Sequence, residues 1–422
     1  MTPSPFSAAF EGLARPARLG ALLRLGPEPL SVVWANPSRG LHCAGLGIAG
    51  EGGGPVRWLS GAPPKPPPGP WFGGWAFDAS RPWDGFPAER WVLPEVLAWW
   101  DGRAPWVAAF GPAGVGAAAL ERRLEAVLET EPHTSGPRAR RLASDAAQWR
   151  RLVDGALSAI DAGRFEKVVC ARVIDVASDE PFSERAVLKA LEARHKQCWT
   201  FLVRGTDGRA FVGASPEVLC EARGDVLCVD ALAGTAAVGQ GAALMRSEKD
   251  RREHDAVVKE IARVLAPFAE SVERPEGPAV KVLANVDHLH TPFRATLKPG
   301  VDPLLVARAL HPTPAVAGLP RDPALAFLKG REGFHRGWYA GAVGAMGDGG
   351  LTLVVALRSA LLGGARAQLF VGAGVVEGSD AEAEWLETER KARALLPVLG
   401  VHDDVVPLDA RAAPRNGGRL RA

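Results

Sequence analysis

The stretch Gly372-Ala-Gly-Val-Val-Glu-Gly-Ser-Asp-Ala-Glu-Ala-Glu-Trp-Leu-Glu-Thr388 carries the strongest signal in the chain. It predicts a glycine-bracketed turn followed by a helix, with Ser379 and Glu382, three residues apart, forming a capping box. Behind this cap Glu384 and Glu387 are also three positions apart, so both carboxylates project from the same side of the helix. Two like charges so placed are destabilising unless a cation meets them. The segment is therefore a candidate metal site.

The composition of the 422-residue chain is that of a soluble globular protein, with 47% hydrophobic and 23% charged residues. The net charge is +2, and basic residues do not cluster with aromatic ones. We therefore expect neither a nucleic-acid nor a membrane partner. Five cysteines without a C-x-x-C pair argue against a disulfide framework and a zinc site. The N-terminus lacks a signal-peptide pattern, so we expect a cytoplasmic protein with reduced thiols.

Three regions differ in composition. Residues 1–140 are rich in Gly, Pro and Trp, with short apolar runs at 30–35 and 71–77 that are typical of strands. Residues 141–400 alternate clear helical and strand patterns, and residues 401–422 form a polar tail that we expect to be disordered. Strands come in adjacent runs between helices and do not alternate strictly with them. This order favours an α+β fold with antiparallel sheet.

Several elements of the second region can be delimited from their apolar spacing. A helix is expected from Ser144 or Asp145 to Gly163, and another over 248–268 whose apolar stripe extends back to Glu253. Strands are expected at 167–173, 210–213, 351–357 and 368–371.

Glu253 is a charge in line with a core-facing stripe, so it needs a partner. That partner is either an arginine or a metal ion. Glu384 and Glu387 have a similar alternative, a solvated face on which Lys391 pairs with Glu387 four residues before it. If the three glutamates converge, each pair at about 4 Å repels by ~1–4 kcal/mol. A hard, oxygen-preferring cation such as Mg²⁺ would reverse that repulsion.

Two further charged residues have both a structural and a chemical interpretation. Lys167 lies on a strand between apolar neighbours; it is either solvent-facing or a desolvated amine with a lowered pKa that can act as a general base. Glu217 follows a strand and a proline; it is either an exposed loop carboxylate or a general acid with a raised pKa.

Other residues could bind an anion. Residues 372–374 form either a nest of backbone N–H groups or a plain tight turn. Arg358, at the end of a strand, could hold a carboxylate with two hydrogen bonds. Tyr339 is the only tyrosine beside 13 tryptophans, a hint that its hydroxyl is needed, although a core aromatic is the default. His288 and His311 lack metal-ligand spacing, and we expect them to pack or to hydrogen-bond.

Together these segments resemble the chorismate-utilising enzymes, which include isochorismate, salicylate, anthranilate and aminodeoxychorismate synthases. Eight motifs occur in the family's order between Lys167 and Leu396: Lys167-Val-Val-Cys-Ala-Arg172, Gly213-Ala-Ser-Pro-Glu217, Leu232-Ala-Gly-Thr235, Asp250-Arg-Arg-Glu-His254, His288-Leu-His-Thr291, His311-Pro-Thr-Pro-Ala-Val-Ala-Gly318, Arg336-Gly-Trp-Tyr-Ala-Gly341, and the stretch from Gly372 to Thr388. The segments Trp34-Ala-Asn-Pro37 and Phe72-Gly-Gly-Trp-Ala-Phe-Asp78 resemble the more variable front half of the menaquinone and siderophore branch.

The resemblance implies one large domain of two mostly antiparallel sheets packed face to face, with helices outside and the active site between the sheets. It implies that Mg²⁺ binds at the positions of Glu253, Glu384 and Glu387 and holds the ring carboxylate of chorismate. The remaining matched positions imply substrate contacts. These come from Arg358 and Tyr339, from His288 near the ring, from Ala233, Gly234 and Thr235, and from backbone donors of Gly372-Ala373-Gly374.

Two positions, Lys167 and Ala233, favour an isochorismate synthase within this family. Lys167 matches the lysine that activates water for attack at C2, and Glu217 would protonate the departing C4 hydroxyl. Ala233 stands where aminodeoxychorismate synthases can carry a nucleophilic lysine. With water as nucleophile no glutaminase partner is required, and we expect a monomer or homodimer. The alternatives are a salicylate synthase, an anthranilate synthase-like enzyme and a catalytically silent binding subunit.

Overall fold

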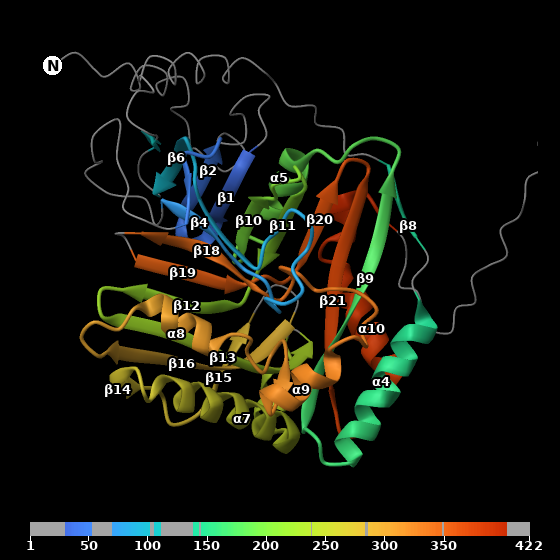
Figure 1. Cartoon of the computed structure of the whole chain (residues 1–422). Helices are drawn as coiled ribbons and strands as arrows, with labels where there is room; N and C mark the ends of the chain where they lie inside the picture. Colours follow the sequence, from blue (N-terminus) through green and yellow to red (C-terminus); the bar gives the residue numbers. More distant parts are fainter. Residues whose placement is uncertain are drawn as a thin grey trace, which may run out of the picture.

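The computed structural model describes residues 30–52, 70–101, 105–110, 138–142, 145–237, 239–282, 286–347 and 350–402. Within these residues the chain forms two antiparallel sheets, one of 11 strands and one of 10. Helices lie outside them (Figure 1). The predicted α+β class with two large sheets is confirmed. Most of the predicted polar tail, from residue 403 on, lies outside the described residues.

The first sheet combines strands from both ends of the chain. In spatial order it contains β17 (Gly318–Leu319), β9 (Lys167–Ser178), β21 (Arg366–Val376), β20 (Ser359–Gly363), β11 (Ala210–Ser215), β10 (Trp199–Arg204), β1 (Leu30–Asn36), β2 (Leu41–Leu46), β6 (Val96–Asp101) and β7 (Pro105–Ala109), with β8 (Ala139–Arg141) paired to β9.

The second sheet has the same mixed origin. Its order is β14 (Ala269–Glu273), β16 (Val286–Leu297), β13 (Val226–Ala237), β12 (Val218–Arg223), β19 (Gly350–Val355), β18 (Ala342–Gly347), β4 (Trp71–Trp75), β5 (Glu89–Leu93) and β3 (Gly50–Glu51), with β15 (Ala279–Val282) paired to β16. The N-terminal region thus extends both sheets. In Figure 1 the strands of this sheet run across those of the first.

One core joins the two sheets. Phe201 and Phe211 of the first sheet belong to the same buried cluster as Phe72, Phe293 and Leu353 of the second. Burying such large aromatic and aliphatic side chains removes apolar surface from water, the main favourable contribution to folding. The two sheets therefore stabilise each other as one unit.

Helices cover the outer faces (Figure 1). They are α4 (Ala146–Asp161), α5 (Glu184–Arg194), α6 (Gly241–Arg246), α7 (Glu248–Leu265), α8 (Pro303–Leu310), α9 (Arg321–Leu328) and α10 (Ala381–Ala392), with short 3₁₀ segments at Pro37–Arg39 and Leu396–Leu399. Of the two helices predicted from apolar spacing, α4 begins after the Asp145 cap, as expected. The second, α7, begins after Ser247 and ends three residues before the predicted position 268.

The pairing of β9 with β21 determines the backbone conformation at Gly372, Ala373 and Gly374. These strands are in register from Arg366 opposite Ala177 to Val376 opposite Lys167. Gly372, Ala373 and Gly374 therefore lie inside β21, and the predicted turn or nest at these glycines is wrong. The extended partner strand β9 holds them straight, and the turn comes at Gly378, where φ is +78°.

The start of α10 also differs from the prediction. Asp380 is the N-cap, and its side chain accepts a hydrogen bond from the Ala383 N–H at 2.9 Å. The predicted capping box at Ser379 is wrong, because the Ser379 hydroxyl accepts from the Val376 N–H and donates to Glu384 Oε1 at 2.8 Å. That contact fixes Glu384 toward the end of β21.

A buried group of charges ties α10 to the first sheet. Glu389 of α10 accepts hydrogen bonds from Arg141 of β8, at 2.5 and 2.6 Å, and from Arg172 of β9. The Arg172 guanidinium lies 3.6 Å from the ring centre of Trp385. Glu389 is 1% exposed, so this carboxylate depends on its two arginines.

Candidate functional site

A cavity of about 360 Å³ lies where β9, β21, β13 and β16 meet α7 and α10. Residues from all eight sequence motifs and Arg358 line it, although the chain separates them by more than 200 positions. The predicted site residues in its lining are Lys167, Glu217, Ala233, Gly234, Glu253, His288, Tyr339, Arg358, Gly372, Gly374, Glu384 and Glu387. Thr235 follows on β13, but its side chain lies outside the described part of the chain.

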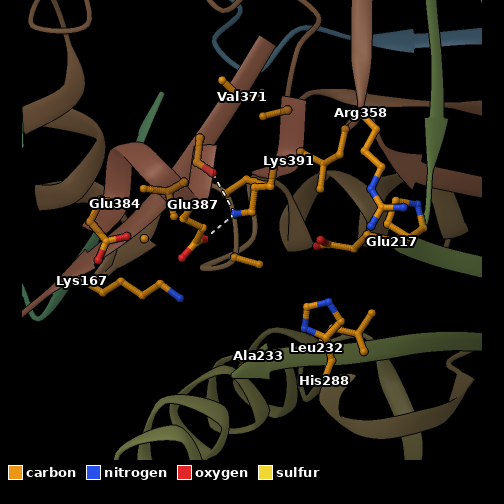
Figure 2. Close-up of a pocket in the computed structure, with 18 of the residues that line it drawn as sticks. Lys167, Glu217, Leu232, Ala233, His288, Arg358, Val371, Glu384, Glu387 and Lys391 are labelled. Atoms are coloured by element: carbon orange, nitrogen blue, oxygen red, sulfur yellow. Dashed lines mark hydrogen bonds and ion pairs between the residues drawn. The ribbon is translucent and has the colours of Figure 1, made fainter. Parts of the chain in front are cut away.

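Lys167 stands at the first position of β9 and enters the cavity (Figure 2). Its amine donates a hydrogen bond to Glu253 Oε1 from α7. The Lys167 side chain is 12% exposed, so the solvent-facing alternative is wrong. The pair brings two predicted site residues, 86 positions apart in the chain, into direct contact.

Glu217 enters the cavity from the side opposite Lys167 (Figure 2). It connects β11 to β12, and its backbone N–H donates to the Ser215 hydroxyl, which in turn donates to the Val355 carbonyl at 2.6 Å. Burial raises the pKa of Glu217 to about 7, although the positive charges of Lys167 and Lys391 act to lower it. Near neutral pH this carboxyl can therefore both carry and release a proton.

The glycines of β21 leave room for two functional side chains. A Cβ at Gly372 would lie 3.0 Å from the Tyr339 hydroxyl, and a Cβ at Gly374 would lie 3.1 Å from Lys167 Cε. Ala373 faces the other side of the strand and belongs to the buried cluster that contains Trp385, so its side chain does not line the cavity. Successive residues of a strand point to opposite faces, which explains the division.

Two residues adopt left-handed backbone conformations that side chains disfavour. Among the described residues these are Ala340, with φ +58°, and Arg358, with φ +47°, and both line the cavity. Such strained conformations cluster at functional sites, where the surrounding structure holds them. Arg358 also donates a hydrogen bond from Nη1 to Cys198 Sγ at 3.6 Å. The left-handed backbone conformation of Arg358 thus directs its guanidinium group into the cavity.

The floor of the cavity comes from β13 and β16. The register of these strands shifts between Ala233 and Thr235, a bulge centred on Gly234 with φ +74°. The Gly234 carbonyl accepts a hydrogen bond from His288 Nδ1 at 3.0 Å. Burial lowers the pKa of His288, so its imidazole is neutral at pH 7 and is oriented by this backbone contact.

The three glutamates proposed as metal ligands line the same cavity, but each contacts a protein partner. Glu253 pairs with Lys167, Glu384 with Ser379, and Glu387 with Lys391 at 2.7 Å. Within the described ranges, no three His, Cys, Asp or Glu side chains form a ready group of metal ligands. The donor chemistry, three carboxylates, still suits a hard dication.

Sequence reasoning missed two cations of this site. Lys391 donates to the Gly372 carbonyl at 2.8 Å as well as to Glu387, so it is more than a surface helix partner. Arg336 is buried, pairs with Glu332, and donates to the Val316 carbonyl at 2.8 Å. A lysine one helical turn after a predicted ligand was the available signal for Lys391. For Arg336 the signal was its position at the start of a matched motif.

Comparison with known proteins identifies the family. The family model described as "Chorismate binding enzyme" matches residues 65–400. The chain belongs to the chorismate-binding enzymes. This chorismate-binding enzyme is 40% identical over 293 residues to the salicylate biosynthesis isochorismate synthase of Pseudomonas aeruginosa, a match that covers 66% of this chain and 61% of that protein. It is 30% identical over 351 residues to the isochorismate synthase MenF of Bacillus subtilis, covering 78% and 74%.

Solved structures of the family agree on the fold. The structure of MenF, the menaquinone-specific isochorismate synthase from Escherichia coli, superposes with a TM-score of 0.78 at 26% identity and covers 94% of this chain and all of that one. Anthranilate synthase component I from Streptococcus pneumoniae, at 20% identity and a TM-score of 0.67, shares the fold. Among the described helices of this family member, none is both long and apolar enough to cross a bilayer.

Proposed function

We propose that this protein is an isochorismate synthase, which converts chorismate reversibly into isochorismate. The observation that carries the proposal is the pair of Lys167 and Glu217, which enter one cavity from opposite sides with Glu217 at a pKa of about 7. A base on one side of a ring and an acid on the other are what hydroxyl exchange across a diene needs. Several similar proteins also bear this name.

In this mechanism Lys167 takes a proton from a water molecule as that water attacks C2 of the ring. The ring double bonds shift, and Glu217 gives its proton to the C4 hydroxyl, which leaves as water. The atoms balance, because one water enters and one departs, while one proton is gained by Lys167 and one lost by Glu217. To accept that proton, Lys167 must react as the uncharged amine, with its lone pair directed at the water molecule.

The remaining cavity residues would bind and orient the substrate. Chorismate carries two carboxylates, and Arg358 and the Tyr339 hydroxyl would hold the one on the enolpyruvyl group. Lys391, whose amine already contacts the Gly372 carbonyl inside the cavity, adds a second positive charge. The neutral His288 would contact the ring, and the Ala233 backbone would border it.

We further propose that Glu253, Glu384 and Glu387 hold Mg²⁺. When bound, the ion would offset part of the negative charge of these carboxylates and of the substrate's ring carboxylate. Each glutamate would exchange its present partner for the ion. For Glu384 and Glu387 these partners include the Ser379 hydroxyl and the Lys391 amine.

The test is a product assay with purified protein, chorismate and MgCl₂, analysed by chromatography with and without ammonia. We expect isochorismate and unreacted chorismate at equilibrium under both conditions. Stoichiometric salicylate and pyruvate would identify a salicylate synthase, the alternative that shares these residue roles. Anthranilate formed only with ammonia would identify an amine-forming enzyme, and absence of turnover would favour a silent binding subunit.

A further inference from the structure

The buried imidazole of His311 links the N-terminal region to the wall of the active-site cavity. The indole N–H of Trp75, in β4, donates to His311 Nδ1 at 3.0 Å, and His311 Nε2 lies 2.9 Å from the Ala340 carbonyl. Trp75 and His311 are 6% and 7% exposed. Neither residue lines the cavity, and the mechanism above does not use them.

The hydrogen bond from Trp75 fixes the state of the imidazole. An indole nitrogen can only donate, so His311 Nδ1 must carry a lone pair, and in the neutral ring the proton resides on Nε2. Burial lowers the pKa of His311 to about 4, so the ring is neutral throughout the physiological range. His311 Nε2–H therefore donates to the Ala340 carbonyl.

Ala340 is a residue that needs such support. Its φ of +58° is unfavourable for alanine, and its N–H is held by the Ala356 carbonyl at 3.0 Å. The preceding residue is Tyr339, whose ring stacks on Phe370 and whose hydroxyl lies beside Gly372 in the cavity. The direction of the Tyr339 side chain depends on the backbone of this turn.

We propose that His311, oriented by Trp75, is a positioning residue that holds Ala340 in its left-handed conformation and thereby sets the Tyr339 hydroxyl in the substrate cavity. The catalytic consequence rests on the proposed function. The structural claim does not, because it concerns only how His311 determines the position of Tyr339.

The chain offers a direct probe, because Tyr339 is its only tyrosine. Protein grown with 3-fluorotyrosine carries one fluorine position, and its ¹⁹F NMR signal reports the surroundings of Tyr339 independently of activity. His311→Asn keeps a polar group near Nδ1 but cannot reach Ala340, whereas the longer amide of His311→Gln can. We expect H311N to shift or broaden the signal and H311Q to leave it near the wild-type position.

Rescue by glycine is the discriminating step. Glycine adopts positive φ without penalty, so A340G should restore the H311N signal toward that of the A340G single variant. The control is His42→Asn, which removes another buried histidine, paired with Glu192 at 3.1 Å and absent from the cavity lining. An unchanged signal in H311N, or a shift that A340G does not reverse, would overturn the proposal.

Steady-state kinetics with chorismate provide a second test of the role of His311. H311N should raise KM more than it lowers kcat, with kcat/KM falling on the order of 100-fold, because small misplacements of binding groups have effects of that size. The kcat/KM of H311N/Y339F should equal that of Y339F within about twofold, because both substitutions remove the same contribution, that of the Tyr339 hydroxyl. Additive losses would contradict action through Tyr339.

The test still gives an answer if H311N does not fold or if the wild-type protein has no isochorismate synthase activity. If H311N does not fold, Trp75→Phe leaves the imidazole in place and should reduce kcat/KM about fivefold, as expected for one neutral hydrogen bond, with reversal by A340G. W75F activity equal to wild type would then overturn the proposal. If the wild-type protein forms no isochorismate, the proposed function fails, and the fluorine signals alone decide the role of His311.

Discussion

Replacing Glu217 by glutamine should abolish turnover and stabilise the protein above neutral pH. Burial raises the Glu217 pKa from its ordinary 4.5 to about 7, and each pKa unit corresponds to about 1.4 kcal/mol. Ionising this carboxyl therefore costs the folded state about 3 kcal/mol more than the unfolded chain. Because glutamine has nearly the same shape and no charge, Glu217→Gln removes that cost.

The sign of the pH dependence follows from linkage. The folded-state pKa is the higher one, so between pH 4.5 and 7 the unfolded chain releases its proton while the folded protein keeps it. The wild-type free energy of unfolding therefore falls by about 3 kcal/mol across this window and is then constant as far as Glu217 is concerned. E217Q lacks this loss, so its stability relative to wild type should rise by about 3 kcal/mol from pH 4.5 to pH 8.

Urea unfolding of both proteins at several pH values measures this difference. Glu180→Gln, which removes an exposed carboxylate on the surface, is the control. The assignment of Glu217 as a buried acid would be refuted if the difference in free energy of unfolding between E217Q and wild type did not change with pH. It would also be refuted if E217Q were less stable than wild type at pH 8. In wild type, kcat/KM should decline above about pH 7, because the general acid must be protonated.

Other predictions concern the base, the metal and the buried charges. Lys167→Ala should lower kcat by at least 10²-fold while circular dichroism and melting temperature show an intact fold; near-wild-type turnover would exclude the base assignment. Glu384→Gln should raise the Mg²⁺ concentration needed for half-maximal activity at least tenfold, whereas Glu382→Gln, on the same helical turn but outside the cavity lining, should not. Removal of divalent cations with EDTA should abolish wild-type activity and MgCl₂ should restore it; full activity in EDTA would contradict a metal role. Glu389→Ala should lower the free energy of unfolding by about 3–5 kcal/mol, because it leaves two buried arginines without their carboxylate; a loss below about 1 kcal/mol in urea titrations would show that the group is solvated.

Much of the site could be predicted because the chemistry resides in short local patterns. Glu384 and Glu387 share a helix face whatever the rest of the fold does, and Glu253 extends an apolar stripe that has to be buried. Glu217 follows a strand and a proline, so its position at the end of a strand could be predicted. Each of these residues lines the cavity.

The errors arose where a distant partner decides the local conformation. The glycines Gly372 and Gly374 predict a turn, yet eleven consecutive residue pairs between β21 and β9 keep them extended. Ser379 and Asp380 are both good capping residues, and only the contact of Ser379 with Glu384 separates their roles. The hydrogen bond between Trp75 and His311 joins residues 236 positions apart. No local spacing could reveal it.

The central claim is that Lys167 directs water to C2 while Glu217 releases the C4 hydroxyl. Running the reaction in H₂¹⁸O and locating the label in isochorismate by mass spectrometry tests this claim most directly. One ¹⁸O atom at C2 in each product molecule is the predicted result. Isochorismate that retains the original hydroxyl oxygen, with no label from the solvent, would contradict it.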